Sequence, residues 1–208
     1  MDLFGYQHSD TQINLLPFDG EVHYFGPVLA ETADDYLTDL LASIPWQSDI
    51  VTMFGKRIIT KRQYAWYGDK RYVYKYSGSS RIAEAMPETL SNIKSAVESV
   101  TSARYNACLL NLYHDGSEGM GWHADDEPEI IVNSPIASVS FGADRRFDFK
   151  HRKTQEKVSL VLEHGSVLVM SSATQQHWLH QLPKTKKVSD PRINLTFRAM
   201  NDWTIAKE

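Results

Sequence analysis

The chain has 208 residues, 42% of them apolar, and its 22 basic and 26 acidic side chains give a formal net charge of −4. This length and apolar content predict one domain over 1–208 that buries a full core, and no apolar run approaches the roughly 20 residues that cross a bilayer. The single cysteine, Cys108, excludes an internal disulfide framework and suits a reducing compartment. The first residues lack the basic start and apolar run of a secretory signal, so we expect a cytoplasmic protein, or a nuclear one in a eukaryote.

Two amphipathic helices are predicted in the first half of the chain. Apolar residues recur at helical spacing from Ala33 to Ile44, and Pro45 ends that pattern. A second helix begins near Pro87, and its apolar stripe is formed by Leu90, Ile93, Val97 and Val100. Both stripes are expected to pack against the core.

The segment from Lys56 to Tyr76 is basic and aromatic, although the chain as a whole is acidic. It holds seven basic residues and one acid, Asp69, with aromatic residues between them. Basic groups neutralise phosphates and aromatic faces stack on unpaired bases, so the segment predicts a nucleic-acid surface. The alternative is an aromatic-rich strand pair with a solvated basic face.

The second half of the chain shows short alternating strands separated by glycine turns. One strand is predicted over 105–113. Strands over 136–141 and 146–150 are predicted to form a hairpin, and strands over 158–162 and 167–170 a second hairpin. This pattern predicts a mainly β fold with flanking helices, arranged as a sandwich or jelly roll with the helices outside it.

Two histidines and a carboxylate indicate a metal site. His123 and Asp125 stand two apart, so in a strand they share a face while Ala124 points away, and His180 follows later in the chain. Two histidines and one carboxylate form the facial triad of non-haem Fe(II) oxygenases, which leaves three metal positions open for chemistry. A His-x-Asp tripeptide alone is a weak signal, because such tripeptides also occur in surface loops.

A second motif, the strand from Arg192 to Arg198, strengthens the first. Alternation places the polar residues Arg192, Asn194, Thr196 and Arg198 on one face and the apolar residues on the other. Two arginines on one face suit a ligand with a carboxylate at each end, whereas a half-solvated edge strand is the simpler alternative. Together the two motifs indicate an iron enzyme that consumes a dicarboxylic 2-oxo acid.

Further motifs accompany these two: Phe54-Gly55-Lys56, Tyr67-Gly68-Asp69, Asn111-x-Tyr113, Ser134-Pro135-Ile136-Ala137-Ser138, His164-Gly165-Ser166 and His177-Trp178-x-His180. With them, residues from about 49 to 200 resemble the AlkB family of Fe(II)/2-oxoglutarate-dependent nucleic-acid dealkylases, and within it the branch that repairs double-stranded DNA. The resemblance implies a double-stranded β-helix, which is a jelly roll, with an N-terminal helical region and a nucleotide-recognition lid over 50–78.

The resemblance also implies a metal site and a cosubstrate site. His123, Asp125 and His180 would bind Fe(II). His177 is the rival for the third position, but in an extended strand it points away from the face of His180, and the family pattern selects His180. The cosubstrates would be 2-oxoglutarate and dioxygen, and the residues implied to bind 2-oxoglutarate are Asn111, Tyr113, Arg192, Asn194 and Arg198.

Two lid residues match contacts to the DNA around an extruded base. Phe54 matches the apolar finger that fills the gap left in a duplex, and Arg62 matches a basic contact beside the extruded base. The family usually has Pro-Arg at this point, whereas this chain has Lys61-Arg62. The departure weakens the match of the lid more than that of the metal site.

The remaining substrate residues would hold the base itself. Tyr74, Tyr76 and Ser77 match the segment that sandwiches a flipped base against a histidine ligand. Asp126 and Glu127 match acids that contact the exocyclic amino group or hold an arginine of the base pocket.

The implied reaction is oxidative dealkylation repair of 1-methyladenine and 3-methylcytosine in DNA, with release of formaldehyde, succinate and CO2. Alkylation of the pairing edge lowers the cost of flipping such a base. We expect a monomer that acts on alkylated DNA, double-stranded in preference to single-stranded, and that has no membrane partner. One alternative is an RNA or tRNA demethylase of the same family; another is a non-catalytic nucleic-acid reader, which would need neither the triad nor the arginines.

Overall fold

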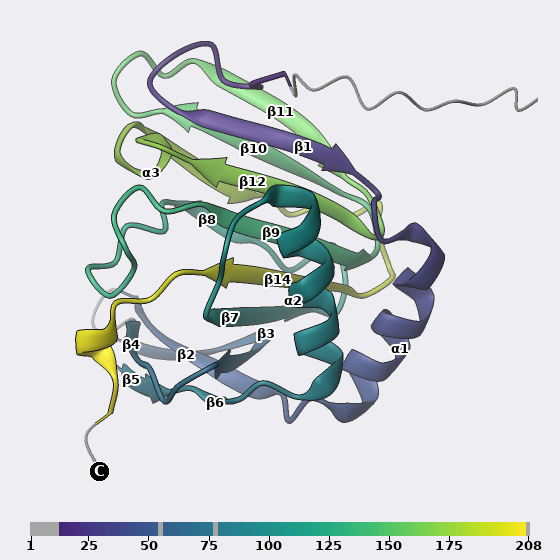
Figure 1. The fold of residues 1–208 in the computed structure, drawn as a ribbon. Coiled ribbons are helices and arrows are strands. Elements are labelled where there is room, and N and C mark those ends of the chain that lie inside the picture. The colour runs from purple at the N-terminus through teal and green to yellow at the C-terminus, as the bar shows by residue number, and fades with distance from the viewer. Residues whose placement is uncertain (1–12, 54–55, 77–78, 207–208) are drawn as a thin grey trace, which may run out of the picture.

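Two antiparallel sheets form the centre of the computed structural model, which describes residues 13–53, 56–76 and 79–206, with side chains outside 49–58 and 75–79 (Figure 1). In the main sheet, neighbouring strands follow the order β1 (Glu21–Gly26), β12 (Ser166–Ser171), β9 (Ile136–Gly142), β14 (Arg192–Arg198), β7 (Ala107–Tyr113), β3 (Lys56–Gly68) and β2 (Gln47–Met53). The short strand β6 (Glu84–Ala85) pairs with β3 in parallel. The minor sheet orders β11 (Lys157–Leu162), β10 (Arg145–His151), β13 (Trp178–Leu182) and β8 (Met120–His123).

The two hairpins predicted from the sequence are wrong in their pairing, although their strands exist. β9 belongs to the main sheet and β10 to the minor sheet, and β11 and β12 are divided in the same way. At Gly142 the backbone takes a φ of +89°, which glycine adopts without strain, and the chain there crosses from one sheet to the other. Consecutive strands that alternate between two sheets form a jelly roll, so the predicted fold class is confirmed.

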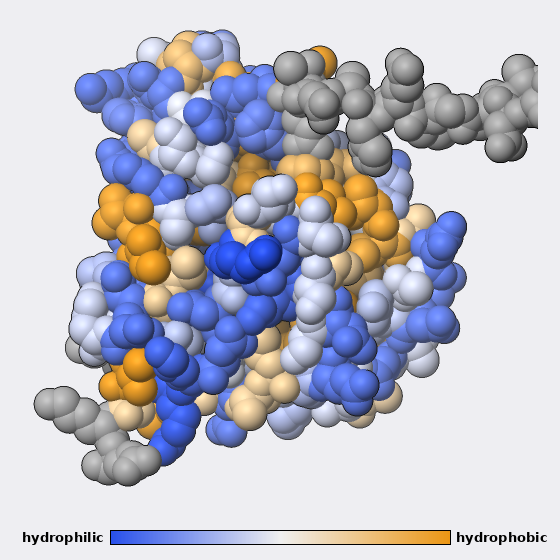
Figure 2. All heavy atoms as spheres, in the orientation of Figure 1, coloured by the Kyte–Doolittle hydropathy of each residue, from blue (hydrophilic) through white to orange (hydrophobic). Residues whose placement is uncertain are grey.

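The two long helices cover the outer face of the main sheet. α1 (Ala33–Ser43) and α2 (Glu88–Thr101) lie side by side over it in Figure 1. Their apolar residues join one core cluster with Ile193, Leu195 and Phe197 of β14. Val100 departs from its predicted stripe because it lies in the last turn of α2, where it is 36% exposed. The outward faces of the helices are largely hydrophilic (Figure 2), as their amphipathic patterns predict.

A second core cluster lies between the sheets and closes one end of the space that separates them. It joins Ile136 and Leu168 of the main sheet with Phe149 and Trp178 of the minor sheet. The far end of this space is lined by polar residues and forms the cavity described below. None of the described helices is long and apolar enough to cross a membrane.

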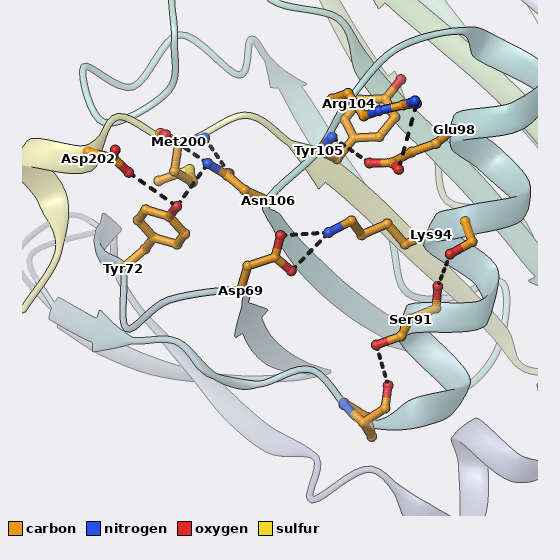
Figure 3. Close-up of polar contacts among 12 residues, drawn as sticks. Asp69, Tyr72, Ser91, Lys94, Glu98, Arg104, Tyr105, Asn106, Met200 and Asp202 are labelled. Carbon is orange, nitrogen blue, oxygen red and sulfur yellow. Dashed lines mark hydrogen bonds and ion pairs between the residues drawn. The ribbon is translucent and has the colours of Figure 1, made fainter.

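A small hairpin pairs β4 (Val73–Tyr76), which falls within the predicted lid over 50–78, with β5 (Ser79–Ile82), which begins just after it. The C-terminal segment holds its base, because Asn106 Nδ2 donates to the carbonyl of Met200 and to the hydroxyl of Tyr72, each over 3.0 Å (Figure 3). Tyr72 also pairs with Ile205 across a β-bridge. The lid is therefore anchored immediately beyond the end of β14.

Candidate active site

A cavity of about 130 Å³ opens between the sheets, beside the β4–β5 hairpin. Residues of β7, β8, β13 and β14 line it, together with side chains of the lid. It collects eleven of the residues singled out from the sequence: Arg62, Tyr74, Asn111, Tyr113, His123, Asp125, Glu127, His180, Arg192, Asn194 and Arg198. Motifs far apart in the chain thus meet in one space.

The predicted iron ligands meet on one side of this cavity. β13 pairs with β8 so that His180 lies directly opposite His123, and their ring centroids are 4.3 Å apart. Asp125 follows two residues after His123, and ligand atoms of the three side chains lie within 4.8 Å of one another. β8 ends at His123, so strand alternation does not govern the next residues, and Ala124 borders the cavity instead of pointing away from it.

The protonation states of the triad suit metal binding. Burial alone would raise the pKa of Asp125, but the Arg198 guanidinium, 3.0 Å away, and the two histidines outweigh it and hold this pKa at about 2. Burial, with a smaller contribution from His123, lowers the pKa of His180 to about 3. Near neutral pH the group therefore offers a carboxylate and a neutral imidazole, which are the forms that bind metal ions.

Neighbouring groups orient both imidazoles. His123 Nδ1 lies 2.8 Å from the carbonyl of Gly121, and donation to that carbonyl leaves the lone pair of Nε2 facing Asp125. The Phe147 ring stacks on His180 at 27° with centroids 5.5 Å apart. The backbone N–H of Asp125 donates to Gln175 Oε1 over 2.9 Å. The donor set and its supports fit a divalent iron ion.

The predicted faces of β14 are confirmed, since its polar residues line the cavity and Ile193, Leu195 and Phe197 lie in the core on the other side. The two arginines nevertheless differ in their partners. Arg198 forms the ion pair with Asp125, whereas Arg192 donates to Ser140 Oγ and Asn194 Oδ1 over 2.9 and 2.8 Å. Arg198 is therefore neutralised by the protein, and Arg192 has only neutral acceptors among these contacts.

Arg192 is a buried cation that lacks a carboxylate partner among the described residues. Its side chain is fully enclosed, at 2% exposure, and Nε finds no hydrogen-bond acceptor in that part of the chain. Burial lowers its pKa to about 10; Tyr113 opposes this shift, and the charge of Arg145 adds to it. An unpaired buried charge is strongly unfavourable, so the cavity end at Arg192 fits an anionic group such as the carboxylate of 2-oxoglutarate.

The lid side of the cavity is formed by Tyr74, Glu127 and Arg62. The Tyr74 hydroxyl donates to Glu127 Oε1 over 2.5 Å, and burial raises the pKa of Tyr74 above its usual range. Arg62 is buried and donates through Nη1 to Asn111 Oδ1, so it reaches from the lid to the predicted cosubstrate residues. Phe54 and Ser77 lie outside the described residues, as does the side chain of Tyr76.

Asp126 does not border the main cavity, unlike its neighbour Glu127. Its carboxylate is 58% exposed and pairs with Arg152 over 3.0 Å. It lines a neighbouring cavity of about 160 Å³ that does not include the triad histidines. A direct contact of Asp126 with a base held in the main cavity therefore has no support in this geometry.

His177 does not approach the triad. It ends the short helix α3 (Thr174–His177), and β13 begins at Trp178, so the extended strand assumed from the sequence does not reach it. It instead joins Asp19 and His151 in a separate cluster.

Four cavity residues were given no role from the sequence, although alternation had already placed Thr196 on the polar face of its strand. Ser138 Oγ donates to Asn194 Oδ1 over 2.9 Å, Thr196 Oγ1 accepts from Asn194 Nδ2 over 2.8 Å, Phe147 stacks on His180, and Arg81 stacks 3.6 Å above the ring of Tyr64. Ser138 could have been found, because a serine within the otherwise apolar strand β9 indicates a polar neighbour. The sequence held no comparable indication for Arg81, because β5 was not predicted.

Comparisons with known proteins agree with this geometry. Residues 21–198 match the model of the 2OG-Fe(II) oxygenase superfamily. The chain is 42% identical over 172 residues to the DNA oxidative demethylase ALKBH2 of Mus musculus, covering 79% of this chain and 69% of the relative. It is equally identical to human ALKBH2, of which it spans 63%, and 36% identical to the mouse alpha-ketoglutarate-dependent dioxygenase alkB homolog 3, of which it spans 65%.

The solved structure of OsALKBH1 superposes on this chain with a TM-score of 0.62 at 17% sequence identity. The superposition covers 88% of this chain and 99% of the OsALKBH1 chain. This likeness concerns the fold. The superfamily match and the mouse relative carry the assignment further. The chain belongs to the 2OG-Fe(II) oxygenase superfamily and, within it, to the AlkB family, whose members use Fe(II), 2-oxoglutarate and dioxygen.

Proposed function

We propose that this protein is an oxidative demethylase of DNA bases alkylated on their pairing edge, such as 1-methyladenine and 3-methylcytosine. The observation that carries the proposal is the single cavity in which the two-histidine, one-carboxylate group faces Arg192 on one side and the acidic and aromatic lid residues on the other. The relatives named as DNA oxidative demethylases support the substrate class.

In this proposal His123, Asp125 and His180 hold Fe(II). When bound, the iron together with 2-oxoglutarate and dioxygen supplies the oxidation of the N-alkyl carbon, which leaves as formaldehyde while the cosubstrate leaves as succinate and CO2. Arg198 fixes the carboxylate of Asp125 through their ion pair. Arg192 binds the far carboxylate of 2-oxoglutarate, because it is a buried cation of the cavity whose hydrogen-bond partners, Ser140 and Asn194, are neutral.

Asn111, Tyr113 and Asn194 complete the cosubstrate pocket. Asn111 receives a hydrogen bond from Arg62, and Asn194 is held by Ser138 and Arg192. These contacts fix the amide groups before the ligand arrives, which lowers the ordering cost of binding.

Tyr74 and Glu127 recognise the base. The hydroxyl of Tyr74 donates a hydrogen bond to Oε1 of Glu127. The other carboxylate oxygen, Oε2, is buried and has no hydrogen-bond partner among the described residues. That oxygen is an acceptor for the exocyclic amino group of adenine or cytosine. Its negative charge also favours 1-methyladenine and 3-methylcytosine, which carry a positive charge. The triad histidines lie in the same cavity, so the methyl group of a flipped base would point towards them.

The preference for duplex DNA is proposed from Phe54, which lies outside the described residues, and from the basic residues of the segment that follows it, Lys56 to Tyr76. The aromatic residues predicted to stack on bases there are largely buried, among them Trp66, Tyr67, Tyr72 and Tyr74, so they do not form an open stacking surface. The test measures formaldehyde release from matched oligonucleotides that carry 1-methyladenine in duplex DNA, single-stranded DNA or RNA, with and without 2-oxoglutarate. We expect release that requires 2-oxoglutarate and is fastest on the duplex. Faster release from RNA would replace the DNA proposal with the RNA alternative, and no release from any of the three would refute the demethylase proposal.

A further inference from the structure

A second group of two histidines and one carboxylate lies apart from the cavity. His151 ends β10, His177 ends α3, and Asp19 belongs to the loop that precedes β1. One ligand atom from each side chain lies within 4.8 Å of the others. Figure 1 shows the loop before β1, the turn between β10 and β11, and α3 at one end of the molecule. We infer that Asp19, His151 and His177 bind a Zn²⁺ ion that fastens the N-terminal loop to the minor sheet.

His151 supplies the strongest observation. Its side chain is 2% exposed, and Nε2 is buried with no hydrogen-bond partner among the described residues. Asp19 Oδ2 lies 3.3 Å from this nitrogen, yet the contact lacks the geometry of a hydrogen bond. A buried polar nitrogen left in this state is unfavourable, and an ion held between Nε2, the carboxylate and His177 would satisfy it.

The other nitrogen of His151 can set the required tautomer. Nδ1 lies 3.0 Å from Thr154 Oγ1, and donation to this hydroxyl leaves a lone pair on Nε2 that points at Asp19 and His177. Metal-binding histidines typically donate their second N–H in this way. The competing tautomer accepts the N–H of Thr154 on Nδ1, over 3.1 Å, and directs a proton from Nε2 to Asp19. The first tautomer therefore belongs to a zinc site, and the second to a simple histidine–aspartate pair.

Hydrogen bonds and ring contacts hold the loop that carries Asp19 in place. Asn14 Oδ1 accepts the N–H groups of Leu16 and Val22, over 3.0 and 2.9 Å, and so closes the loop on itself. The carbonyl of Phe18 accepts Trp178 Nε1 over 3.0 Å, and the Phe18 ring meets His151 edge-on at 5.0 Å.

Asp19 has a φ of +52°, a region that residues other than glycine rarely adopt. The conformation directs the carboxylate of Asp19 to His151, while its side chain remains 52% exposed, so an ion can enter from solvent.

The donor set is compatible with zinc. Two imidazole nitrogens and one carboxylate oxygen, with a fourth position open to water, form the coordination that zinc takes in its three-ligand sites. For such ligands the affinity for Zn²⁺ exceeds that for Fe²⁺. No residue is shared with the active-site triad, so the two sites can be tested separately.

An ion at this position would brace the strand that carries His180. β10 and β13 pair with His151 opposite Trp178 and Phe149 opposite His180. His151 and His177 therefore mark the end of the strand pair on which the triad histidine is mounted. The proposed role is structural, and it predicts that zinc raises stability without a role in turnover.

The test counts zinc per chain in the full-length protein, by metal analysis after equilibrium dialysis at a fixed, low concentration of free Zn²⁺. Because zinc also fits the triad, the wild type should bind two equivalents. His123→Ala should keep one equivalent and should still melt at a higher temperature when zinc is present. His177→Gln and Asp19→Asn should each bind one equivalent, and in the combined variant His123→Ala/His177→Gln the shift in melting temperature should disappear.

His164→Gln is the matched control, because His164 Nε2 contacts Asp34 over 3.2 Å and this pair forms no three-residue cluster among the described residues. This variant should keep two equivalents. His177 and Asp19 are used in place of the buried His151, whose loss could prevent folding. The proposal is overturned if His123→Ala binds no zinc, or if His177→Gln and Asp19→Asn still bind two equivalents.

Discussion

The described part of the chain contains two clusters with the same donor set, and their surroundings differ. His123, Asp125 and His180 line a cavity between the sheets, whereas Asp19, His151 and His177 lie at one end of the central strands of the minor sheet. Only the first cluster adjoins a buried arginine that lacks an acidic partner among the described residues. The comparison teaches that ligand identity alone does not assign chemistry; the space and the charge beside the ligands do.

The electrostatic surroundings separate the two carboxylates most clearly. Asp125 is buried and paired with Arg198, which together with the histidines holds its pKa at about 2. Asp19 is half exposed and has only His151 as an ionic neighbour among the described residues. Replacement of these two residues should therefore have very different consequences.

The largest expected effect follows from Asp125→Asn. The change removes a metal ligand and leaves Arg198 as an uncompensated buried charge, so turnover should be abolished and the free energy of unfolding should fall by about 3–5 kcal/mol. Urea unfolding in the presence of a chelator measures the stability of the metal-free chain. Asp19→Asn, measured in the same way, should cost far less; equal losses from both variants would remove the distinction between the clusters.

The stability contributed by Asp125 should also depend on pH. Its pKa is lowered in the folded chain to about 2, from an ordinary value near 3.9 when unfolded. Its contribution is therefore fully present above the unfolded value and is lost as the pH falls towards 2. Metal-free wild type and Asp125→Asn should differ in unfolding free energy at pH 6, and the two values should converge only below about pH 2. A difference that stays constant over this range would contradict the ion pair.

The next largest effect is expected from Arg192, the arginine proposed to bind 2-oxoglutarate. Arg192→Ala should raise the 2-oxoglutarate concentration for half-maximal turnover by tens-fold or more, since loss of one partner of a buried charge pair typically costs about 2–5 kcal/mol. Arg198→Ala should also raise it, and should in addition weaken iron binding because Asp125 loses its partner. Arg146→Ala, at a largely exposed arginine of β10, is the control and should change neither value. Unchanged half-saturation in both variants would refute the two-arginine site.

The smallest of these effects concerns the lid. Phe54→Ala should slow repair of 1-methyladenine in duplex DNA by about tenfold, equivalent to roughly 1.4 kcal/mol, because an inserted ring offsets part of the cost of base extrusion. A single strand has no gap to fill, so its repair should change much less. Paired rates at one salt concentration make the comparison, since phosphate contacts depend on ionic strength. Equal losses on both substrates would identify Phe54 as a packing residue.

Local patterns in the sequence predicted the elements and much of the site. Alternation in β14 correctly separated Arg192 and Arg198 from the core residues between them, because a strand repeats every two residues whatever its partners. Pro45 and Pro87 likewise marked the end of α1 and the start of α2. The resemblance to a known family then joined motifs that local patterns could not connect.

Pairing between distant strands could not be predicted in the same way. The glycine turn at Gly142 indicates a reversal of the chain equally well within one sheet or between two, so β9 and β10 were wrongly paired. Asp126 pairs with Arg152, and His177 lies beside His151, but no local pattern in the sequence linked either residue to its partner. Such contacts between distant residues form only when the whole chain has folded.

The most direct test of the account is iron-dependent binding of 2-oxoglutarate, measured without oxygen by equilibrium dialysis of the labelled cosubstrate. The cluster beside Arg192 borders a cavity and a buried cation that fit this ligand, so the signal reports on that cluster. We expect iron-dependent binding in the wild type and in His177→Ala, and its loss in His180→Ala. Retention in His180→Ala together with loss in His177→Ala would contradict the assignment of the active site.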